Sequence, residues 1–429
     1  MPSYKLRLYL PAVIPPGNLQ STFYWTPQGR SSFSPFLGPS LGQLGPVKTQ
    51  NREFARIAAA VFAADRSTPR KGGGSNWNQR TFELSIPVAD VAMWESVAEP
   101  LSRLLGFLSG DIWSLSFFHS SSPRESVAPR HQGAARVVLL SGGADSAIGA
   151  LLSRTQLDAE QAHSLVSHVG FTNLAPFQDH VAGEILNLIP GPGQQHIPIQ
   201  FHRMSKQPNG TKFACSEPSS RTRSLLFLAL GLAVASLDGV PLWIPENGFA
   251  SLNPPLGPER RGSLSTRTTH PYFLLELSRI LTMVDAQAEI TNPLADKTKG
   301  ELFQMVADLI GIDQASHFLS STHSCGLTYQ RFLGLPSSMQ CGVCFGCVVR
   351  RASFASSGVS DRTVYVDSRA SLEVANWLAS KSIIPSVRDF VKRGVRSADI
   401  QSLSIPDGYS LTDAFDLCVR SLAELASIL

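Results

Sequence analysis

Residues 137–146 constrain the fold of this chain more than any other stretch. They read Val-Val-Leu-Leu-Ser-Gly-Gly-Ala-Asp-Ser, and small and aliphatic residues continue through Leu152. An apolar strand that ends in a glycine-rich turn and leads into a helix gathers backbone N–H groups at the positive end of the helix dipole. The stretch therefore predicts a strand, an anion-binding loop and a helix. The alternative is a tight turn that merely happens to be rich in glycine.

This loop is not a Walker loop, because it lacks the lysine of Gly-x-x-x-x-Gly-Lys-Ser/Thr. It resembles the Ser-Gly-Gly-x-Asp-Ser loop of the PP-loop ATP pyrophosphatase superfamily, which cleaves ATP to AMP and pyrophosphate while activating a substrate as an adenylate. The resemblance implies that the leaving pyrophosphate is contacted by Ser141, Gly142, Gly143 and Ser146. Asp145 either holds Mg²⁺ or caps the helix, and both interpretations stay open.

A second motif is a set of cysteines with the spacing C-x15-C-x2-C-x2-C, formed by Cys325, Cys341, Cys344 and Cys347. Four thiolates suit one tetrahedral ion, and structural zinc is favoured over an iron–sulfur cluster. Disulfides are disfavoured, because the chain has six cysteines in 429 residues and shows no secretory signal. Cys215 and Cys418 are interpreted as ordinary thiols. His323 could replace a ligand, but four cysteines already fill the tetrahedron.

The two motifs, in this order, resemble QueC, the 7-cyano-7-deazaguanine synthase family, over about residues 134–358. Shorter matches are the arginine-containing helix start at 220–227, Asn292-Pro293-Leu294, the Lys299-Gly300-Glu301 run, and an Arg and a Phe after the knot at 350–354. The resemblance implies a PP-loop fold with ATP, Mg²⁺ and Zn²⁺ as cofactors. It also implies a deazaguanine-type carboxylate as substrate.

The same resemblance assigns roles to individual residues. The residues expected to act in catalysis are Asp145, Ser146, Arg223 and Lys299. Arg223 points at the ATP phosphates and Lys299 neutralises phosphate charge; for each, the alternative is an exposed residue at a helix start. A second strand passes beneath the adenine, and its backbone groups at Ser167, His168 and Val169 read the edge of the base.

The chain also departs from the family pattern. Ser224 stands where the family has Asn, and His323 replaces an aromatic residue before the first zinc cysteine. The family's substrate loop has no counterpart. In its place are Glu246-Asn247-Gly248-Phe249 and a Pro- and Arg-rich stretch at 253–261. Asn247 either reads a base edge with its amide or holds a turn with Gly248.

The coarse pattern predicts three regions. Residues 1–125 are expected to form an α+β domain with its own sheet, with strands near 4–10, 81–88 and 111–119 and helices at 52–65 and 92–108. A long Pro/Gly/Ser-rich loop runs to about 48, and a linker covers 120–133. Residues 134–358 form the PP-loop domain with its zinc knot. Residues 359–429 form a helical extension, with helices near 372–380 and 411–429.

Within the PP-loop domain strands and helices alternate. Strands are expected near 136–140, 164–169, 196–202 and 240–245, and helices near 146–154, 176–188 and 219–237. Alternation of this kind predicts an α/β fold, a parallel sheet with helices on both faces and the ligand at the carboxyl ends of the strands.

Composition is typical of a soluble enzyme, with 43% hydrophobic and 16% charged residues. The net charge of +4 is too small to indicate nucleic-acid binding, and the longest apolar run, 225–235, is too short to span a bilayer. We expect a cytoplasmic protein that does not bind membranes. Because it is extended at both ends, we also expect a protein or nucleic-acid partner for residues 1–125.

Three functions are compatible with the sequence. The first is a QueC-like enzyme of a bacterial anti-phage cassette, of the QatC type, which transfers the activated carboxylate to an amine. The second is a synthase of queuosine biosynthesis that uses ammonia. The third, a non-catalytic zinc-ribbon protein that binds nucleic acid, is disfavoured because basic and aromatic residues are not interleaved in a patch.

Overall fold

The structure is a computed structural model of the chain. It describes residues 2–10, 21–25, 31–33, 41–70, 78–120, 133–169, 175–218, 220–256, 267–326, 334–336 and 339–429. Most of the expected linker at 120–133 lies outside these ranges. The same holds for much of the Pro/Gly/Ser-rich loop before residue 48 and for the second half of the stretch at 253–261.

A five-stranded parallel sheet forms the centre of the molecule. Its strands follow the order β7-β6-β5-β8-β9, and every neighbouring pair is parallel. The strands are β5 (Ala134–Leu139), β6 (Ala162–His168), β7 (Gly193–Ile199), β8 (Leu242–Trp243) and β9 (Ile290–Thr291). Because the strand order reverses at β5 and β8, a crevice for a ligand is expected at the carboxyl ends of these two strands.

Helices cover both faces of this sheet, as the sequence predicts. Neighbouring residues of β5 point to opposite sides, so that Val137 joins one hydrophobic cluster and Val138 the other. One face carries α4 (Ala144–Thr155), α5 (Ala175–Leu188), α9 (Lys299–Ile310) and α10 (Ile312–Ser321). The opposite face carries α6 (Arg223–Ala235) and α8 (Pro271–Met283).

The N-terminal region forms a second sheet, in the order β2-β1-β3-β4. Its elements are β1 (Ser3–Tyr9), β2 (Thr22–Tyr24), a 3₁₀ helix (Leu41–Leu44), α1 (Thr49–Ser67), β3 (Thr81–Val88), α2 (Val91–Glu95), α3 (Ala98–Ser109) and β4 (Ile112–His119). The separate sheet is present as predicted. All its strand pairs are parallel, however, so the region has the strand direction of an α/β layer rather than of the expected α+β layer. Helix α1 connects β2 to β3, and α2 and α3 connect β3 to β4; crossovers of this kind make the parallel direction possible.

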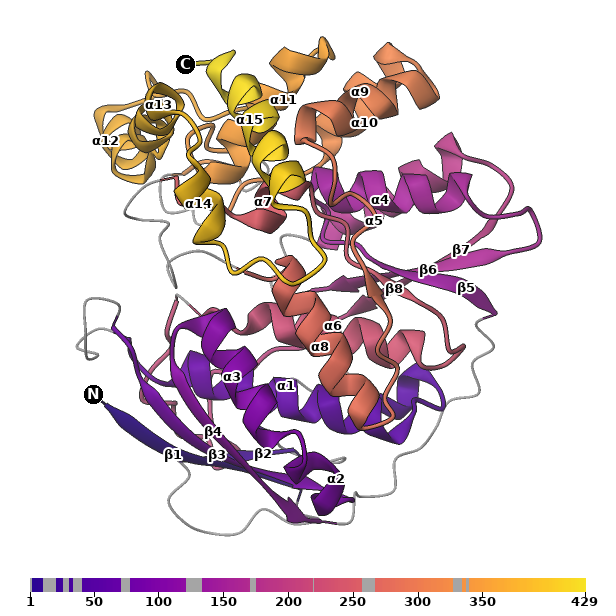
Figure 1. Ribbon diagram of the computed structural model, residues 1–429, viewed down its shortest axis with the longest axis vertical. Helices are drawn as coiled ribbons and strands as arrows, with labels where there is room; N and C mark the ends of the chain where they lie inside the picture. The colour runs from indigo at the N-terminus through magenta and orange to yellow at the C-terminus, as the bar shows by residue number, and fades with distance from the viewer. Residues whose placement is uncertain are drawn as a thin grey trace.

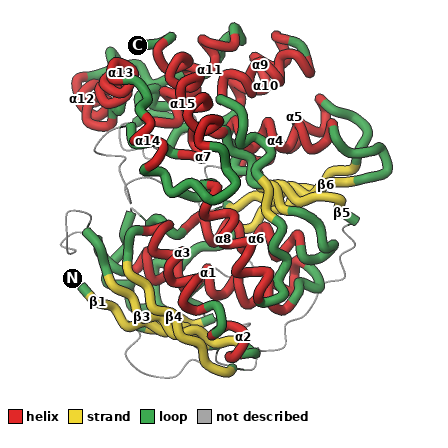
Figure 2. Tube along the Cα trace, viewed as in Figure 1, coloured by secondary structure: helices red, strands yellow, loops and turns green. Residues whose placement is uncertain are grey.

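The two sheets share one hydrophobic core. Helices α1 and α3 cover the face of the N-terminal sheet that is turned toward the central sheet. Helices α6 and α8 cover the opposing face of the central sheet, and the two helix pairs pack against each other (Figures 1 and 2). A single cluster of buried side chains runs from Phe82 in β3, through Phe54 in α1, to Leu226 in α6 and Val137 in β5. The boundary expected near residue 125 therefore separates two sheets that are joined by a continuous apolar layer.

A buried ionic cluster lies at one end of this layer. Arg80 donates hydrogen bonds to both Asp65 and Asp111, and Arg70 donates two to Asp111 at 2.7 and 3.1 Å. The second oxygen of Asp65 accepts from the backbone of Arg221 and from the backbone and hydroxyl of Thr222, at 2.7–3.0 Å. Thr222 immediately precedes α6, so Asp65 fixes the point at which α6 begins.

The C-terminal region is helical, as predicted. It comprises α12 (Leu372–Lys381), α13 (Ile384–Arg393), α14 (Ser397–Gln401) and α15 (Leu411–Ala426), and it follows α11 (Phe345–Ser357), which belongs to the expected zinc-knot region. Side chains of α13 and α15 pack with those of α11 and of the short helix α7 (Gly248–Leu252) in one cluster. This region caps the molecule beside α9 (Figure 1). None of the helices in the described ranges is long and apolar enough to cross a membrane.

Candidate functional site

The glycine-rich loop has the form that the sequence predicts. Strand β5 ends at Leu139 and α4 begins at Ala144. Gly142 has φ +85°, which favours glycine, and an added Cβ would contact Gln178 at 3.4 Å. The hydroxyl of Ser146 donates to the Gly143 carbonyl at 2.9 Å and accepts from the Ser141 amide at 3.1 Å. These hydrogen bonds hold the loop open at the N-terminus of α4, where an anion is stabilised.

Asp145 lies in the first turn of α4 and does not cap it, since the N-cap residue is Gly143 and the Asp145 carboxylate accepts from side chains rather than from the helix backbone. One carboxylate oxygen, Oδ2, accepts from Lys299 Nζ at 2.8 Å and from Asn247 Nδ2 at 3.3 Å. The other, Oδ1, is buried and has no hydrogen-bond partner among the described residues. The capping interpretation of Asp145 is therefore wrong, and the oxygen Oδ1 stays available to a ligand.

Lys299 is buried, with 6% of its surface exposed, which rules out the alternative of an exposed lysine at a helix start. Its helix, α9, begins with a capping box in which Thr298 accepts from the Glu301 amide. Glu424 of α15 accepts from the amide of Gly300 with both carboxylate oxygens, at 3.0 and 3.1 Å. The C-terminal region thus fixes the start of the helix that carries Lys299.

Asn247 has a structural role, which was one of the two roles expected from the sequence. Its Oδ1 accepts from the Ala250 amide at 3.0 Å and so caps α7, while its Nδ2 is shared between Asp145 and Glu246. The next position, Gly248, requires glycine, because an added Cβ would lie 2.1 Å from the Ala295 carbonyl oxygen. The amide of Asn247 is therefore committed to the protein rather than directed at a base edge.

A pocket of about 130 Å³ opens beside the loop, at the carboxyl ends of β5, β6 and β7. It is lined by Leu139, Leu140, Ser141, Val166, His168, Gln178, Ile199, Arg223, Phe227 and Leu230. Arg223 is exposed at the start of α6, with its guanidinium 5.3 Å from the centre of the Phe227 ring. The pocket thus combines an apolar floor with a cation at its rim, a combination common in sites for small molecules.

The structure places Ser167, His168 and Val169 at the end of β6, next to this pocket. The Ser167 hydroxyl donates to the Leu140 carbonyl at 2.7 Å, and the Val169 amide donates to the Ile199 carbonyl at 2.8 Å. Those two groups are used within the sheet. The His168 ring contributes to the pocket wall instead, and it packs against the Phe227 ring with 4.4 Å between ring centres and 32° between the ring planes.

His168 is uncharged. Burial lowers the pKa of His168 to about 4, and its Nε2 lies 2.6 Å from the Phe201 carbonyl oxygen. Because a carbonyl only accepts, this nitrogen carries the proton, and Nδ1 is an acceptor with no partner among the described residues. A neutral aromatic wall of this kind suits a purine ring.

His323 connects the loop to the cysteine knot. Its backbone amide donates to the Gly142 carbonyl at 2.8 Å, and its ring packs on Phe177 with 4.8 Å between ring centres. The side chain is buried, 8% exposed. The two sequence motifs, far apart along the chain, thus touch through one residue.

The four cysteines of the second motif come together in space. The sulfur atoms of Cys325, Cys341, Cys344 and Cys347 lie within 4.8 Å of one another. Two of these separations are 3.8 Å, between Cys341 and Cys347, and 4.0 Å, between Cys344 and Cys325. Sulfurs placed tetrahedrally about 2.3 Å from one zinc ion are about 3.8 Å apart. The donor set and its spacing fit Zn²⁺.

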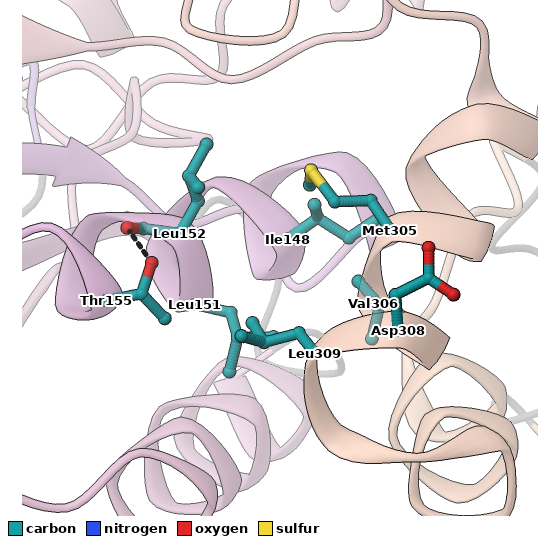
Figure 3. A pocket seen from close by; sticks show the side chains of 8 residues that line it. All are labelled: Ile148, Leu151, Leu152, Thr155, Met305, Val306, Asp308 and Leu309. Carbon is teal, nitrogen blue, oxygen red and sulfur yellow. Dashed lines mark hydrogen bonds between the residues drawn. The ribbon is translucent and has the colours of Figure 1, made fainter.

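A larger hollow of about 270 Å³ lies between α4 and α9 (Figure 3). Its walls are mainly aliphatic, and the hydroxyl of Thr155 is already bonded to the Leu152 carbonyl. Asp308 is the one charged side chain among its lining residues. Because polar groups do not converge here, the smaller pocket beside the loop is the better candidate for chemistry.

Comparisons with known proteins find a similarity that is limited to part of the chain. No protein-family model matches the chain. The chain is 30% identical over 84 residues to a 7-cyano-7-deazaguanine synthase of Methanocaldococcus jannaschii, which covers 19% of this chain and 32% of that protein. A synthase of the same name from Desulfatibacillum aliphaticivorans is 33% identical over 78 residues, or 18% and 28% of the two chains. This chain is similar to QueC-type synthases. The match spans about a third of the length of these curated relatives.

One residue of the site is absent from the sequence-based set. Glu246, between β8 and α7, lies beside Asp145 and Lys299 although about a hundred residues of sequence separate it from Asp145. An acidic residue directly after a strand at the reversal of strand order is the signal that could have identified it. The Pro- and Arg-rich stretch at 253–261 lies partly outside the described residues, and no role is assigned to it.

Proposed function

We propose that this chain binds ATP at the 141–146 loop, activates a deazaguanine-type carboxylate as its adenylate with release of pyrophosphate, and transfers the acyl group to an amine. The observation that carries this proposal is the buried Asp145–Lys299 pair at the open N-terminus of α4. A charged pair at the reversal of strand order suits a reaction in which negative charge develops on a leaving group.

Roles for the loop residues follow from their positions. Ser141, Gly142, Gly143 and Ser146 would contact the pyrophosphate that leaves, and Arg223 would approach the phosphates from the rim of the pocket. The adenosine would occupy the pocket lined by His168 and Phe227. The backbone at the end of β6 would recognise the base. There the His168 carbonyl accepts a hydrogen bond from Gln178 Nε2 at 3.3 Å.

Two metal ions belong to the proposal. Mg²⁺ would bind Asp145 through Oδ1, the buried oxygen without a partner among the described residues, and would offset phosphate charge. Zn²⁺ would be held by the four cysteines and would stabilise the chain from residue 325 to α11, next to the loop. Its role is structural, since four thiolates leave no open coordination position.

The direct test is carboxylate-dependent exchange of radioactive pyrophosphate into ATP, with the 7-carboxylate of 7-deazaguanine as the probe. Exchange that needs the probe, together with AMP as the nucleotide product, is the expected result. ADP as the sole product would contradict the proposal, because attack at the α-phosphate releases the β- and γ-phosphates as one unit.

The biological setting is proposed from the flanking regions. About 200 residues lie outside 134–358. Two of them, Asp65 and Glu424, accept hydrogen bonds from the backbone at the starts of α6 and α9. We place the chain in an anti-phage cassette of the QatC type, with a protein or nucleic acid bound by residues 1–125. Similarity to 7-cyano-7-deazaguanine synthases favours queuosine biosynthesis as the second candidate. Full rescue of queuosine in a strain lacking its own synthase would select the second candidate.

A further inference from the structure

Two side chains of the pocket beside the loop end in buried polar atoms that have no hydrogen-bond partner among the described residues. The atoms are Oε1 of Gln178, near the start of α5, and Nδ1 of His168, at the end of β6. Gln178 is 2% exposed, and both residues line the pocket together with apolar side chains of β5, β7 and α6. Because a buried polar atom without a partner costs free energy, its place in a pocket points to a ligand that supplies the partner.

Two backbone carbonyls fix the orientation of the Gln178 amide. Its Nε2 donates to the Ser141 carbonyl at 3.4 Å and to the His168 carbonyl at 3.3 Å. Since a carbonyl oxygen only accepts, the flipped amide would place Oε1 against two other acceptors. Oε1 is therefore the atom that remains for a ligand, and it can only accept a hydrogen bond.

A third carbonyl fixes the tautomer of His168. Its Nε2 lies 2.6 Å from the Phe201 carbonyl oxygen and so carries the ring proton, which makes Nδ1 an acceptor. Burial lowers the pKa of His168 to about 4, and the nearby Arg223 and His202 add to this effect, so Nδ1 keeps its lone pair near neutral pH. The pocket therefore offers a ligand two acceptors, one from α5 and one from β6.

Two acceptors of this kind match an amino group on the ligand. The 6-amino group of adenine has two N–H donors, whereas guanine and hypoxanthine carry an oxo group, which is an acceptor, at the same place. An oxo group would stand against Gln178 Oε1 and His168 Nδ1 and leave all three acceptors unpaired. Aliphatic side chains and the Phe227 ring form other parts of the wall, and they suit the faces of a purine.

We propose that Gln178 and His168 determine the base specificity of the nucleotide pocket by accepting hydrogen bonds from the 6-amino group of adenine, and this inference rests on the proposed function. Recognition by these side chains adds to recognition by the backbone at the end of β6. A site built to hydrogen-bond one group strongly rejects an analogue that leaves its buried polar atoms unpaired. Because Gln178 also donates to the Ser141 carbonyl, one side chain contacts both the base and the loop.

The carboxylate substrate is the competing occupant of this pocket, since a deazaguanine also carries an amino group. That group is at the 2-position, and the 6-position carries an oxo group. The place of the pocket favours the nucleotide, because Ser141, the first residue of the loop, lines it and Arg223 stands at its rim. A base bound here lies next to the loop proposed to hold its phosphates. The carboxylate is left as an outcome of the test.

The first test varies the ligand and leaves the protein unchanged. Calorimetry would compare binding of ATP, purine riboside triphosphate and ITP to the full chain. Purine riboside triphosphate lacks the 6-substituent, and ITP carries the 6-oxo group. ATP should bind tightest, purine riboside triphosphate about 10-fold more weakly, and ITP about 10²-fold more weakly or worse. Equal affinities for ATP and ITP would overturn the proposal.

The second test removes one acceptor at a time. His168→Gln can keep an N–H donor toward the Phe201 carbonyl but lacks the ring Nδ1, and Gln178→Met has a side chain of similar size without Oε1. Each variant should lower the ratio of ATP affinity to ITP affinity by about 10-fold. A residue that only stabilised the pocket would weaken both nucleotides equally. His180→Gln, at an exposed position of α5, is the matched control and should keep the wild-type ratio.

The remaining outcomes separate this inference from the proposed function. An unchanged affinity ratio in both variants would overturn the inference. A variant that loses affinity for the 7-carboxylate of 7-deazaguanine in the absence of nucleotide, with its ATP-to-ITP ratio intact, would overturn it in favour of the carboxylate. Thermal unfolding checks that the variants fold, and the ligand series decides the question without them. Failure of the wild-type protein to bind any of the three nucleotides would instead refute the proposed function itself.

Discussion

Two parallel sheets in this molecule each bury acidic and basic side chains at one end, and the two clusters differ in how completely they are satisfied. In the N-terminal cluster both oxygens of Asp65 and both of Asp111 accept hydrogen bonds. In the loop cluster Asp145 has one oxygen bonded and the other, Oδ1, buried without a partner among the described residues. His168 Nδ1 and Gln178 Oε1 nearby share that condition.

This difference separates structure from function. A buried carboxylate whose two oxygens both accept hydrogen bonds has no oxygen left for a ligand, and removal of one partner from such a buried pair costs stability. An open set costs free energy in the folded protein and is expected where a ligand completes it. The comparison predicts that changes in the closed sets affect stability first, whereas changes in the open set affect activity first.

The largest effect is expected at the cluster of four cysteines. The purified protein should contain about one zinc per chain, and Cys344→Ser should release it and destabilise the fold, because structural zinc contributes about 10 kcal/mol or more to folding. Metal analysis and thermal unfolding measure both effects. An iron–sulfur absorption band, or metal-free protein purified under reducing conditions, would contradict the assignment.

A smaller loss of stability is expected at the N-terminal ionic cluster. Asp111→Asn leaves the buried Arg70 and Arg80 with one carboxylate fewer and should lower the free energy of unfolding by about 3–5 kcal/mol. Glu99→Gln removes an exposed pair with Arg103 and should cost less than about 1 kcal/mol. Urea unfolding compares the two, and equal costs would break the distinction between buried and exposed charges.

The cluster around Asp145 should show the opposite pattern, with a loss of activity rather than of stability. Asp145→Asn should reduce the rate of pyrophosphate exchange by about 10²-fold or more, which is the usual cost of losing a preorganised charge, with little loss of stability. Asp308→Asn, in the apolar hollow between α4 and α9, is the control and should leave the rate unchanged. A rate that survives in Asp145→Asn while stability collapses would place Asp145 with the structural charges.

The smallest effect is a difference in pH dependence. The raised pKa of Glu246 means that the folded protein keeps a proton which the unfolded chain has already released, so stability falls as pH rises from the ordinary glutamate pKa through the raised one. Glu246→Gln removes this loss, and its melting temperature relative to wild type should increase with pH by about 2 °C or less. A constant difference between pH 5 and about 8 would contradict the raised pKa.

For Asp65 the sign is reversed. Burial alone would raise its pKa, but the guanidinium groups of Arg80 and Arg70 outweigh burial and lower it. Its contribution to stability is present above the unfolded pKa and is lost as the pH falls through the lowered one. The two clusters thus respond to opposite ends of the pH range.

The local features of the site could be predicted from the sequence. The apolar run, the glycine turn and the small helix residues at 137–152 determine their own conformation, and the cysteine spacing indicates the cluster at 325–347. Strand positions in the central sheet followed from the same alternation, whereas β9, α8, α9 and α10 lacked a pattern strong enough to assign.

Contacts between distant segments could not be predicted. Glu246 joins Asp145, Asp65 fixes Thr222, and Glu424 fixes Gly300, all across more than a hundred residues. The parallel direction of the N-terminal strands likewise depends on how crossovers fold back, which residue periodicity does not encode. Sequence therefore identified the loop, and the fold supplied the side chains that surround it.

The apolar layer between the two sheets has a consequence for dividing the gene. Helix α1 buries a nearly continuous run of side chains from Phe54 to Ala64, and much of that run faces α6. A fragment ending near residue 125 would expose this surface, and so would its complement. Produced together as separate polypeptides, the two fragments should associate and rebuild the fold, while each alone aggregates. The chain is thus suited to fragment complementation, with the split at 121–132 reporting on whether both sheets are in place.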